Sequence, residues 1–363
     1  MALNQVGLER LNTATTNKIG ERKNKIINGG MLVNQRGDQS NLTTSVYGLD
    51  RFKVQEAAAV TYDINQSTDT PNGFGNSFHI DIEGANSSPA ASHYMQLITP
   101  LEGFDVQDFA KGTSEAKQYA VSFYIKTNVT GNYALQIIDD NSRSCSQLYT
   151  VSDTNWNRYT VIFPADTTGA IDNDNTEGLR LTWHLLVGSN YTSGTMNTTW
   201  AATTNANIAA GQTANVGSST SNNWYITGVQ LEVGSVATDF EHRSFAEELQ
   251  LCSRYYQKQL SGSTKAVASG FAYNTTYGNF SPHYPMGPMR TAPSLDQTNG
   301  DNYYEINGGL DHGDHLDGAF IIEHGTETTC NIYFDPDASL NNGYGFYIRS
   351  DNAAAYFAYT AEL

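Results

Sequence analysis

The segment 172–178, DNDNTEG, spaces its acidic residues as a calcium-binding loop does. Asp172, Asp174 and Thr176 alternate, which is the pattern by which such a loop presents oxygen ligands to the ion. Glu177, however, stands where a calcium loop needs a glycine for its sharp turn, and no bidentate glutamate follows in register. We therefore interpret this segment as a polar turn and predict no metal site there.

A second cluster of potential metal ligands is LDHGDHLDG, where His312 and His315 stand among Asp311, Asp314 and Asp317. Imidazole and carboxylate groups together could hold a divalent ion, for example on the axis of a trimer. The same residues could equally form a solvated turn between two strands, and this is the interpretation that we favour. The sequence thus predicts that no metal ion and no other cofactor is required.

The sequence lacks the residue patterns of the common catalytic sites. It contains no nucleophile elbow, no glycine-rich phosphate loop and no HExxH motif. The acidic pairs, Asp139 with Asp140 and Glu247 with Glu248, are adjacent in sequence rather than opposed across a cleft, as glycoside hydrolysis requires. No repeat indicates the long β-helix of glycan-cleaving tailspikes. We therefore predict no catalytic residues and a protein that is not an enzyme.

Aromatic residues in polar segments are the remaining candidates for ligand binding. A tyrosine or tryptophan ring combines apolar area with a polar edge, which suits stacking on a sugar. A long polar segment carries Tyr191 and Trp200, and Trp224 follows it, while His283 and Tyr284 lie in a proline-rich segment. These five residues are the predicted carbohydrate contacts, although most aromatic residues in such a composition belong to a core or an interface.

Length and composition predict a mainly β protein of two domains. The chain has 363 residues, 32 glycines, 22 tyrosines and only 16% charged residues, a composition typical of sheets and turns rather than helix bundles. A formal net charge of −17 argues against nucleic acid as a partner, because phosphate binding needs a basic face. No apolar run approaches the roughly 20 residues needed to cross a bilayer, so we predict no membrane insertion.

Four parts follow one another along the chain. Residues 1–24 are polar and too poor in apolar residues to form a core, so they are interpreted as an N-terminal docking peptide. Strand signals such as 78–82 and 225–233 then predict a jelly-roll β-sandwich over residues 25–243. A connecting α-helix is predicted over 244–260, and a smaller C-terminal β-sandwich domain over 261–363.

The connecting helix has a clear predicted start. Ser244 with Glu247 three residues later forms a capping box, which satisfies two unpaired donors at the first turn of a helix. From there apolar residues recur at helical spacing as far as Lys258. The residues assigned to this junction, and to contacts between subunits, are Phe245, Leu249, Cys252, Tyr255 and Tyr256.

The run QLEVGSVATDFEHRSFAEELQLCSRYY resembles the junction segment of bacteriophage tail-fibre and virion surface proteins. Three other segments agree with this resemblance: KIINGGMLVNQRG with YGLDRF near the start, YPMGPMRTAPS near residue 290, and AAAYFAYTAEL at the end. The resemblance therefore covers nearly the whole chain.

The first predicted domain begins with INGG and ends with WYITGVQLEVG, a pairing similar to that of jelly-roll carbohydrate-binding modules. In that group the first and last strands lie together, and acidic residues on them hold a structural calcium ion. Here Met31, Leu32 and Val33 follow the glycines, and Thr227 with Gly228 occupies the last strand. We therefore do not expect the calcium site of that group.

The resemblance implies a bacteriophage virion protein, made in the host cytoplasm and placed on the tail or capsid surface. A tail fibre that attaches to host surface polysaccharide is the first choice, docked on other virion proteins through residues 1–24 and assembled as a homotrimer. The alternative is a capsid-decorating or fibre-base structural protein without receptor binding. A cellular polysaccharide-binding module and a glycan hydrolase rank below both. The sequence identifies neither the glycan nor the protein on which the chain docks.

Overall fold

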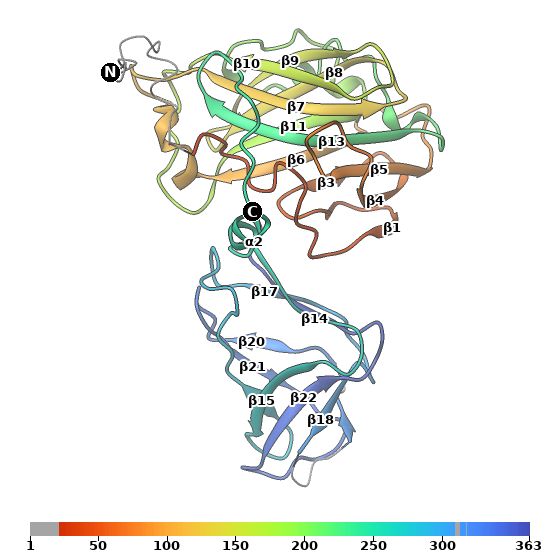
Figure 1. Cartoon of the computed structure of the whole chain (residues 1–363), viewed down its shortest axis with the longest axis vertical. Coiled ribbons are helices and arrows are strands. Elements are labelled where there is room, and N and C mark those ends of the chain that lie inside the picture. The colour runs from red at the N-terminus through yellow and green to blue at the C-terminus, as the bar shows by residue number, and fades with distance from the viewer. Residues whose placement is uncertain (1–21, 309–312, 317) are drawn as a thin grey trace, which may run out of the picture. The chain divides into compact units, whose positions relative to one another are not determined.

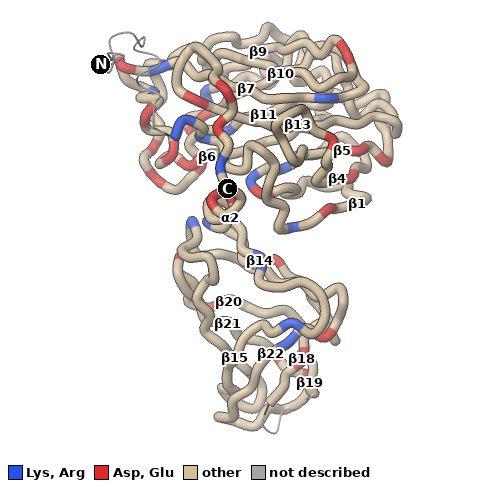
Figure 2. The backbone as a smooth tube through the Cα atoms, in the orientation of Figure 1, with Lys and Arg blue, Asp and Glu red and all other residues tan. Residues whose placement is uncertain are grey.

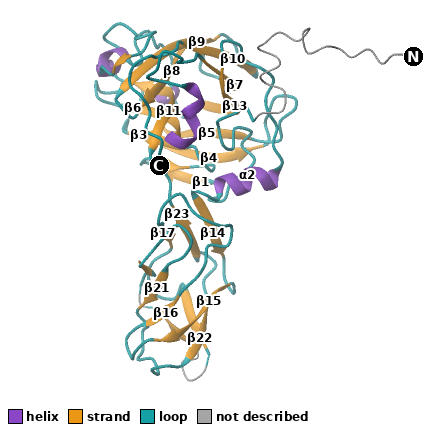
Figure 3. Ribbon diagram, turned by 90° about the vertical axis from the view of Figure 1, so that its left-hand side faces the viewer, coloured by secondary structure: helices purple, strands orange, loops and turns teal. Residues whose placement is uncertain are grey.

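The computed structural model describes residues 22–308, 313–316 and 318–363, and these form a mainly β protein (Figure 3). The predicted fold class is confirmed, because antiparallel sheets build sandwich-like bodies accompanied by a short α-helix. Two compact units divide the chain. The N-terminal unit comprises the described residues up to Leu32 with Asp38–Gly48 and Phe52–Arg243, and the C-terminal unit comprises Val33–Gly37, Leu49–Arg51 and Ser244–Leu363. No described helix is long and apolar enough to cross a membrane.

Two antiparallel sheets build the N-terminal unit (Figure 1). The first has the order β1-β4-β5-β13-β7-β10, with the bounds Gln39–Leu42, Thr61–Ser67, Ser77–Gly84, Asn223–Val233, Tyr119–Thr127 and Asn157–Phe163. The second has the order β12-β9-β8-β11-β6-β3-β2, with the bounds Ala201–Ala202, Arg143–Val151, Gly131–Asp139, Glu177–Val187, Tyr94–Glu102, Lys53–Glu56 and Val46–Tyr47. Short 3₁₀ helices connect them: η2 Gly103–Phe109, η3 Ser189–Tyr191, η4 Asn205–Asn207 and η5 Val216–Ser218.

The inner faces of these two sheets pack on each other through aromatic rings. Phe123 of β7 lies edge-on against Trp183 of β11, with ring centroids 5.6 Å apart, and against Tyr149 of β9 at 5.2 Å. All three side chains are buried. The strand predicted at 78–82 is β5, and its Phe78 and Ile80 point into the same core. The alternating pattern of the sequence therefore marks the buried face correctly here.

The segment that carries INGG runs beside the second half of β13. The backbone N–H of Lys25 donates to the carbonyl oxygen of Leu231 at 2.9 Å, and that of Val229 donates to Gly29 at 2.9 Å. A Cβ at Gly29 would lie 2.1 Å from the Val229 carbonyl oxygen, so this close approach requires glycine. The first and last segments of the unit therefore pair directly, although the first forms a turn rather than the predicted strand.

The side chain of Asn24 also belongs to this pairing. Its Nδ2 donates to the carbonyl oxygen of Val229 at 3.1 Å, and its Oδ1 accepts from the backbone N–H of Leu231 at 3.1 Å. Asn24 is only 4% exposed. It is therefore part of the folded unit, although the sequence placed it in a docking peptide. Residues 1–21 of that predicted peptide lie outside the described residues.

The connecting helix α2, Phe245–Cys252, begins where the sequence predicts and ends earlier. The Ser244 hydroxyl accepts from the backbone N–H of Glu247 at 3.3 Å, as expected of a capping residue. The predicted continuation as far as Lys258 is wrong, because residues from Tyr256 onward form a strand that pairs with β23. Sheet pairing of residues with high β-propensity, such as Tyr256, outweighs the helical spacing of the sequence.

Two further sheets build the C-terminal unit (Figure 1). The first has the order β14-β23-β17, with the bounds Tyr256–Ser261, Tyr356–Thr360 and Ser294–Gln297. The second has the order β19-β18-β22-β15-β16-β21-β20, with the bounds Asp314–His315, Tyr304–Asn307, Gly345–Ser350, Ala266–Ala272, Gly278–Phe280, Asn331–Phe334 and Ile321–Glu323. Phe320 joins them, because its ring lies 5.2 Å from that of Phe357 in β23 and 5.7 Å from that of Phe280 in β16.

The two short early segments of the C-terminal unit are held by its last residues. The carboxylate of Glu362 pairs with the guanidinium groups of Arg36, at 3.1 Å, and of Arg51. The same guanidinium groups lie over aromatic rings, Arg36 at 3.7 Å from the centroid of Tyr256 and Arg51 at 3.4 Å from that of Tyr255. All three charged side chains are at least 91% buried. This buried network therefore ties three distant parts of the sequence into one unit.

Candidate ligand-binding site

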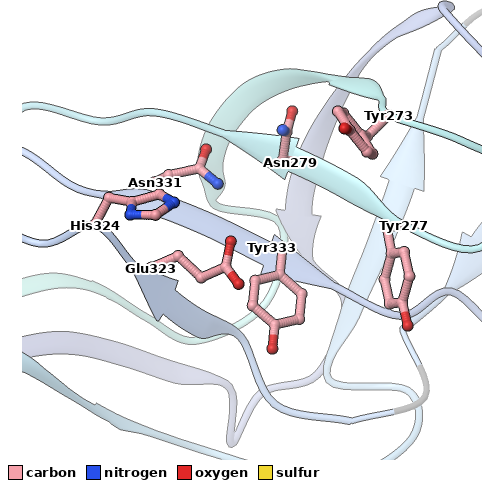
Figure 4. Close-up of a pocket in the computed structure, with 7 residues that line it drawn as sticks. All are labelled: Tyr273, Tyr277, Asn279, Glu323, His324, Asn331 and Tyr333. Atoms are coloured by element: carbon pink, nitrogen blue, oxygen red, sulfur yellow. The ribbon is translucent and has the colours of Figure 1, made fainter.

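A cavity of about 510 Å³ opens on the C-terminal unit. Three tyrosines, two asparagines, a glutamate and a histidine line it: Tyr273, Tyr277, Asn279, Glu323, His324, Asn331 and Tyr333. Figure 4 shows the imidazole and the carboxylate on one side of the cavity, with the tyrosine rings from its middle to the other side. No Lys or Arg is among these lining residues.

Strand register brings the floor of this cavity together. Asn279 of β16 lies directly opposite Tyr333 of β21, and Asn331 of β21 lies opposite Glu323 of β20. Residues opposite each other on paired strands share one face of a sheet, as do residues two apart on one strand. The four side chains therefore stand on the same outer face, while the intervening Ile332 is buried in the core.

The turn between β15 and β16 places two tyrosine rings at the rim. The backbone N–H of Tyr273 donates to the carbonyl oxygen of Tyr277 at 2.9 Å. Inside the turn, the Asn274 side-chain oxygen accepts from the backbone N–H groups of Thr276, at 2.7 Å, and Tyr277, at 2.8 Å. An asparagine that binds its own backbone in this way stabilises a turn. The rings it presents remain open, with Tyr273 65% and Tyr277 42% exposed.

Glycines allow the strands below the cavity to approach closely. A Cβ at Gly270 would lie 2.1 Å from the carbonyl oxygen of Asn279, and one at Gly278 would lie 2.3 Å from the ring of Phe334. Any larger residue at these positions would displace β16, the strand that carries Asn279. The height of the cavity floor therefore depends on both glycines.

The lining combines aromatic faces with amide and carboxylate groups. The rings of Tyr277 and Tyr333 meet edge-on, with centroids 6.0 Å apart and an interplanar angle of 89°. The Asn279 side-chain oxygen is buried and has no hydrogen-bond partner among the described residues. His324 adopts a positive φ of 50°, a conformation that is uncommon outside glycine, just after β20. Such a set of groups can stack on a sugar ring and bond its hydroxyls.

Three of the five predicted carbohydrate contacts are core residues. Trp224 is fully buried in β13, and Tyr284 is 4% exposed, with its hydroxyl donating to the carbonyl oxygen of Thr326 at 3.1 Å. Trp200 is 9% exposed, and its indole N–H donates to the carbonyl oxygen of Pro164 at 2.9 Å. None of these rings has a face open to a ligand. Their assignment as sugar contacts is therefore corrected, because packing accounts for each of them.

The other two predicted contacts are more accessible but do not meet. Tyr191 in η3 is partly exposed, and its ring lies edge-on to that of Tyr94 at 5.8 Å in the N-terminal unit. His283 is exposed in the C-terminal unit, where its backbone bridges that of Thr329. Neither residue lines the cavity. Tyr191 and His283 remain predicted contacts without a common site.

The sequence did not point to the residues of the cavity. They come from two hairpins more than forty residues apart, and only strand register places them on one face. A local signal was present nonetheless. Tyr273 and Tyr277 flank the polar turn NTT between two strands, where no core position exists for either ring.

The predicted junction residues divide between surface and core. Phe245 is 57% exposed and Leu249 is partly exposed, whereas Cys252, Tyr255 and Tyr256 are buried within the C-terminal unit. The three buried side chains are therefore not open to another subunit, and Phe245 is the exposed apolar residue of this group. The predicted subunit contact remains a prediction.

The two clusters of potential metal ligands in the sequence form no metal centre among the described residues. In the segment 172–178, Asp174 accepts from the hydroxyl and the backbone N–H of Thr176 at 2.7 and 2.9 Å, which is a polar turn. In the second cluster, Asp311, His312 and Asp317 lie outside the described residues, and His315 lies 3.3 Å from Asp351.

Comparisons with known proteins leave the chain unassigned. No family model and no curated protein matches it. Among solved structures, the enzymatically active domain of tailspike protein 4 from bacteriophage CBA120 is similar at a TM-score of 0.31 and 10% identity, over 58% of this chain and 21% of that chain. A CBM4 structure reaches 0.30 at 14% identity, over 57% and 97%. TmCBM61 in complex with β-1,4-galactotriose reaches 0.29 at 10%, over 58% and 99%. Scores of this size assign neither a family nor a function.

Proposed function

We propose that this protein binds a neutral glycan through the cavity of its C-terminal unit, as a bacteriophage tail fibre that attaches to the host surface. The observation that carries the proposal is the grouping, around one cavity, of two tyrosine rings from a turn with a third tyrosine and two asparagines on the outer sheet face. The placement on a virion rests on the resemblance of the sequence to tail-fibre and virion surface proteins. Attachment to the host is the role that uses both the glycan-binding cavity and the placement on a virion.

The chemistry of the cavity favours a neutral sugar. Tyrosine rings stack on the apolar C–H face of a pyranose, and an asparagine amide both donates to and accepts from neighbouring hydroxyls. A carboxylate or sulfate on the ligand would meet Glu323 and no Lys or Arg of the lining. The negative charge of the whole chain adds to this preference, because it repels anionic polymers.

The same set of residues favours binding without hydrolysis. Glycoside hydrolysis uses two carboxyl groups that face each other across the scissile bond. Glu323 is the single carboxylate among the residues that line the cavity. The proposed role is therefore attachment rather than cleavage of the glycan.

Assembly strengthens a weak site of this kind. A homotrimer presents three cavities, and several copies on one particle convert weak single-site binding into firm attachment. In this proposal residues 1–21 dock the chain on another virion protein. The exposed Phe245 lies at the contact between copies. Native mass measurement at micromolar concentration tests the trimer, and a monomer alone would contradict it.

The experiment is binding of the purified protein to host cells and to polysaccharide extracted from them. We expect Tyr277→Ala to weaken binding about tenfold, because one stacking ring is lost. Phe104→Ala is the matched control, since Phe104 is an aromatic residue 51% exposed in the N-terminal unit. Equal binding by wild type and Tyr277→Ala would contradict this site. Normal adsorption of particles that lack the protein would favour the structural alternative.

A further inference from the structure

The outer face of the seven-stranded sheet continues beyond the cavity. Phe271 of β15 lies opposite Asn279 on one side and Gly345 of β22 on the other, and Asn279 lies opposite Tyr333. These four residues form one row across four adjacent strands. Figure 3 labels these strands, β22, β15, β16 and β21. Neighbouring strands are about 4.8 Å apart, so the row spans roughly 14 Å.

A second exposed ring stands at the far end of this row. Tyr347 is two residues from Gly345 on β22 and therefore shares its face. Tyr347 lies opposite Ser269 of β15, and it is 45% exposed, while Phe271 is 50% exposed. Gly345 and Ser269 carry no large side chain. No large side chain on these two neighbouring strands therefore covers either ring directly from across the pair.

Polar groups accompany the rings on this face. Asn307 of β18 lies opposite Tyr347 and is only 2% exposed, and its side-chain nitrogen has no hydrogen-bond partner among the described residues. Asn279 has the matching unpaired oxygen at the cavity. Both atoms are buried, so they are polar groups beneath this face rather than contacts for a ligand.

The basic group that stands on this face is already paired with an acidic one. Arg349 of β22 pairs with Glu305 of β18 through two bonds of 2.8 and 2.6 Å. Residues 261–363 contain three Lys or Arg against twelve Asp or Glu, and Figure 2 shows how sparse the basic residues are there. Such an acidic unit would repel an anionic polymer.

We infer that the ligand is an extended chain of several neutral sugars, which lies across the strands from Tyr277 to Tyr347. The inference rests on the proposed function and specifies its ligand. The cavity holds one or two sugars between Tyr277 and Tyr333, and Phe271 and Tyr347 stack on those that follow. A single terminal sugar would leave the exposed rings of Phe271 and Tyr347 unused.

The test measures affinity for fragments of the host polysaccharide, from a disaccharide to a hexasaccharide. For the wild type, we expect affinity to rise about tenfold between these lengths, which corresponds to about 1.4 kcal/mol. Tyr347→Ala should abolish this gain and leave disaccharide affinity unchanged, whereas Tyr277→Ala should weaken both. Phe104→Ala serves as the control, and thermal melting verifies that each variant is folded.

The outcomes separate the two proposals. Equal affinity for both lengths, or a Tyr347→Ala variant that keeps the gain, overturns the extended site and leaves the cavity in place. No binding of any fragment overturns the proposed function together with the inference. A change of oligomeric state in Tyr347→Ala, with affinity unaltered, would identify this face as a contact between copies and also overturn the inference.

Discussion

Tyr273 donates its backbone N–H to the carbonyl oxygen of Tyr277, so that one hydrogen bond closes the turn that presents both rings to the cavity. Asn274 braces this turn from inside, because its side-chain oxygen accepts from Thr276 and Tyr277. The geometry of the binding rim therefore depends on a residue that has no ring and does not line the cavity.

Replacement of Asn274 should consequently weaken binding without unfolding the protein. Asn274→Ala removes the acceptor for two backbone N–H groups, and we expect a loss of about 1 kcal/mol of local stability and several-fold weaker glycan binding. Asn274→Asp keeps the acceptor oxygen and should bind nearly as the wild type does. Titration with the host glycan measures both, and equal affinities for the Ala and Asp variants would rule out a role for the turn.

The aromatic residues that the sequence favoured should affect stability instead of binding. Tyr284→Ala and Trp200→Ala each remove a buried ring, and we expect losses of about 3–5 kcal/mol in the free energy of unfolding. Trp200 also lies 4.5 Å below the ammonium of Lys111, a buried cation that pairs with Asp139 and Asp166. Urea unfolding gives the values. If either variant is as stable as the wild type but binds glycan more weakly, the replaced residue is a sugar contact after all.

Local pattern in the sequence was enough to predict strands with alternating apolar residues, such as β5 and β13. The signal is weaker for β9, because Ser144 and Ser146 occupy buried positions there and interrupt the apolar alternation. It also extended α2 too far, because the pairing of Tyr256 with Thr360 on β23 joins residues about one hundred positions apart. Long-range pairing of this kind leaves no local signal.

The binding cavity also depends on long-range strand pairing that the local sequence does not reveal. Asn279 and Tyr333 are adjacent in space only because β16 and β21 pair in one particular register. A shift by one residue would turn either side chain toward the core. Conversely, Trp200 and Trp224, in or after a polar segment, are buried. Residue type alone, without the strand register, therefore predicts buried rings as ligand contacts and misses the exposed ones.

Glu362 is predicted to be essential to the C-terminal unit. Glu362→Gln removes the carboxylate charge that pairs with the buried guanidinium groups of both Arg36 and Arg51, and we expect a loss of about 3–5 kcal/mol. Glu327→Gln is the control, because Glu327 is exposed in the same unit. Chemical denaturation compares the two variants. A loss of no more than that of the control would mean that the other partners of the arginines, which include the rings and, for Arg36, the charge of Asp50, hold them without Glu362.

A deletion at the N-terminus should distinguish docking from folding, provided that it ends before Asn24. Removal of residues 1–21 should leave the melting temperature unchanged and abolish incorporation into particles. Asn24→Ala should instead lower stability by about 1–3 kcal/mol, since the backbone groups of Val229 and Leu231 lose their partner. Normal assembly of the truncated protein into virions would contradict the docking role.

Acid should destabilise the N-terminal unit through His184. This residue of β11 is 1% exposed, and neither ring nitrogen has a hydrogen-bond partner among the described residues. Burial lowers the pKa of His184 to about 4 from its ordinary 6.5, because the charged imidazolium is desolvated. Between these two values the unfolded chain binds a proton that the folded chain does not. Stability that is complete above pH 6.5 is therefore lost as the pH falls toward 4.

The expected slope is about 1.4 kcal/mol for each pH unit below 6.5, reaching about 3 kcal/mol near pH 4, beyond which this group adds nothing. Other groups titrate in the same range, so the measurement is the difference between wild type and His184→Leu in urea unfolding at pH 7 and pH 5. The Leu variant should lose less stability on acidification, whereas His242→Gln, at an exposed position, should follow the wild type. Identical pH dependence in wild type and His184→Leu would mean that the buried imidazole is protonated at little cost, through a partner or water that reaches it as the pH falls.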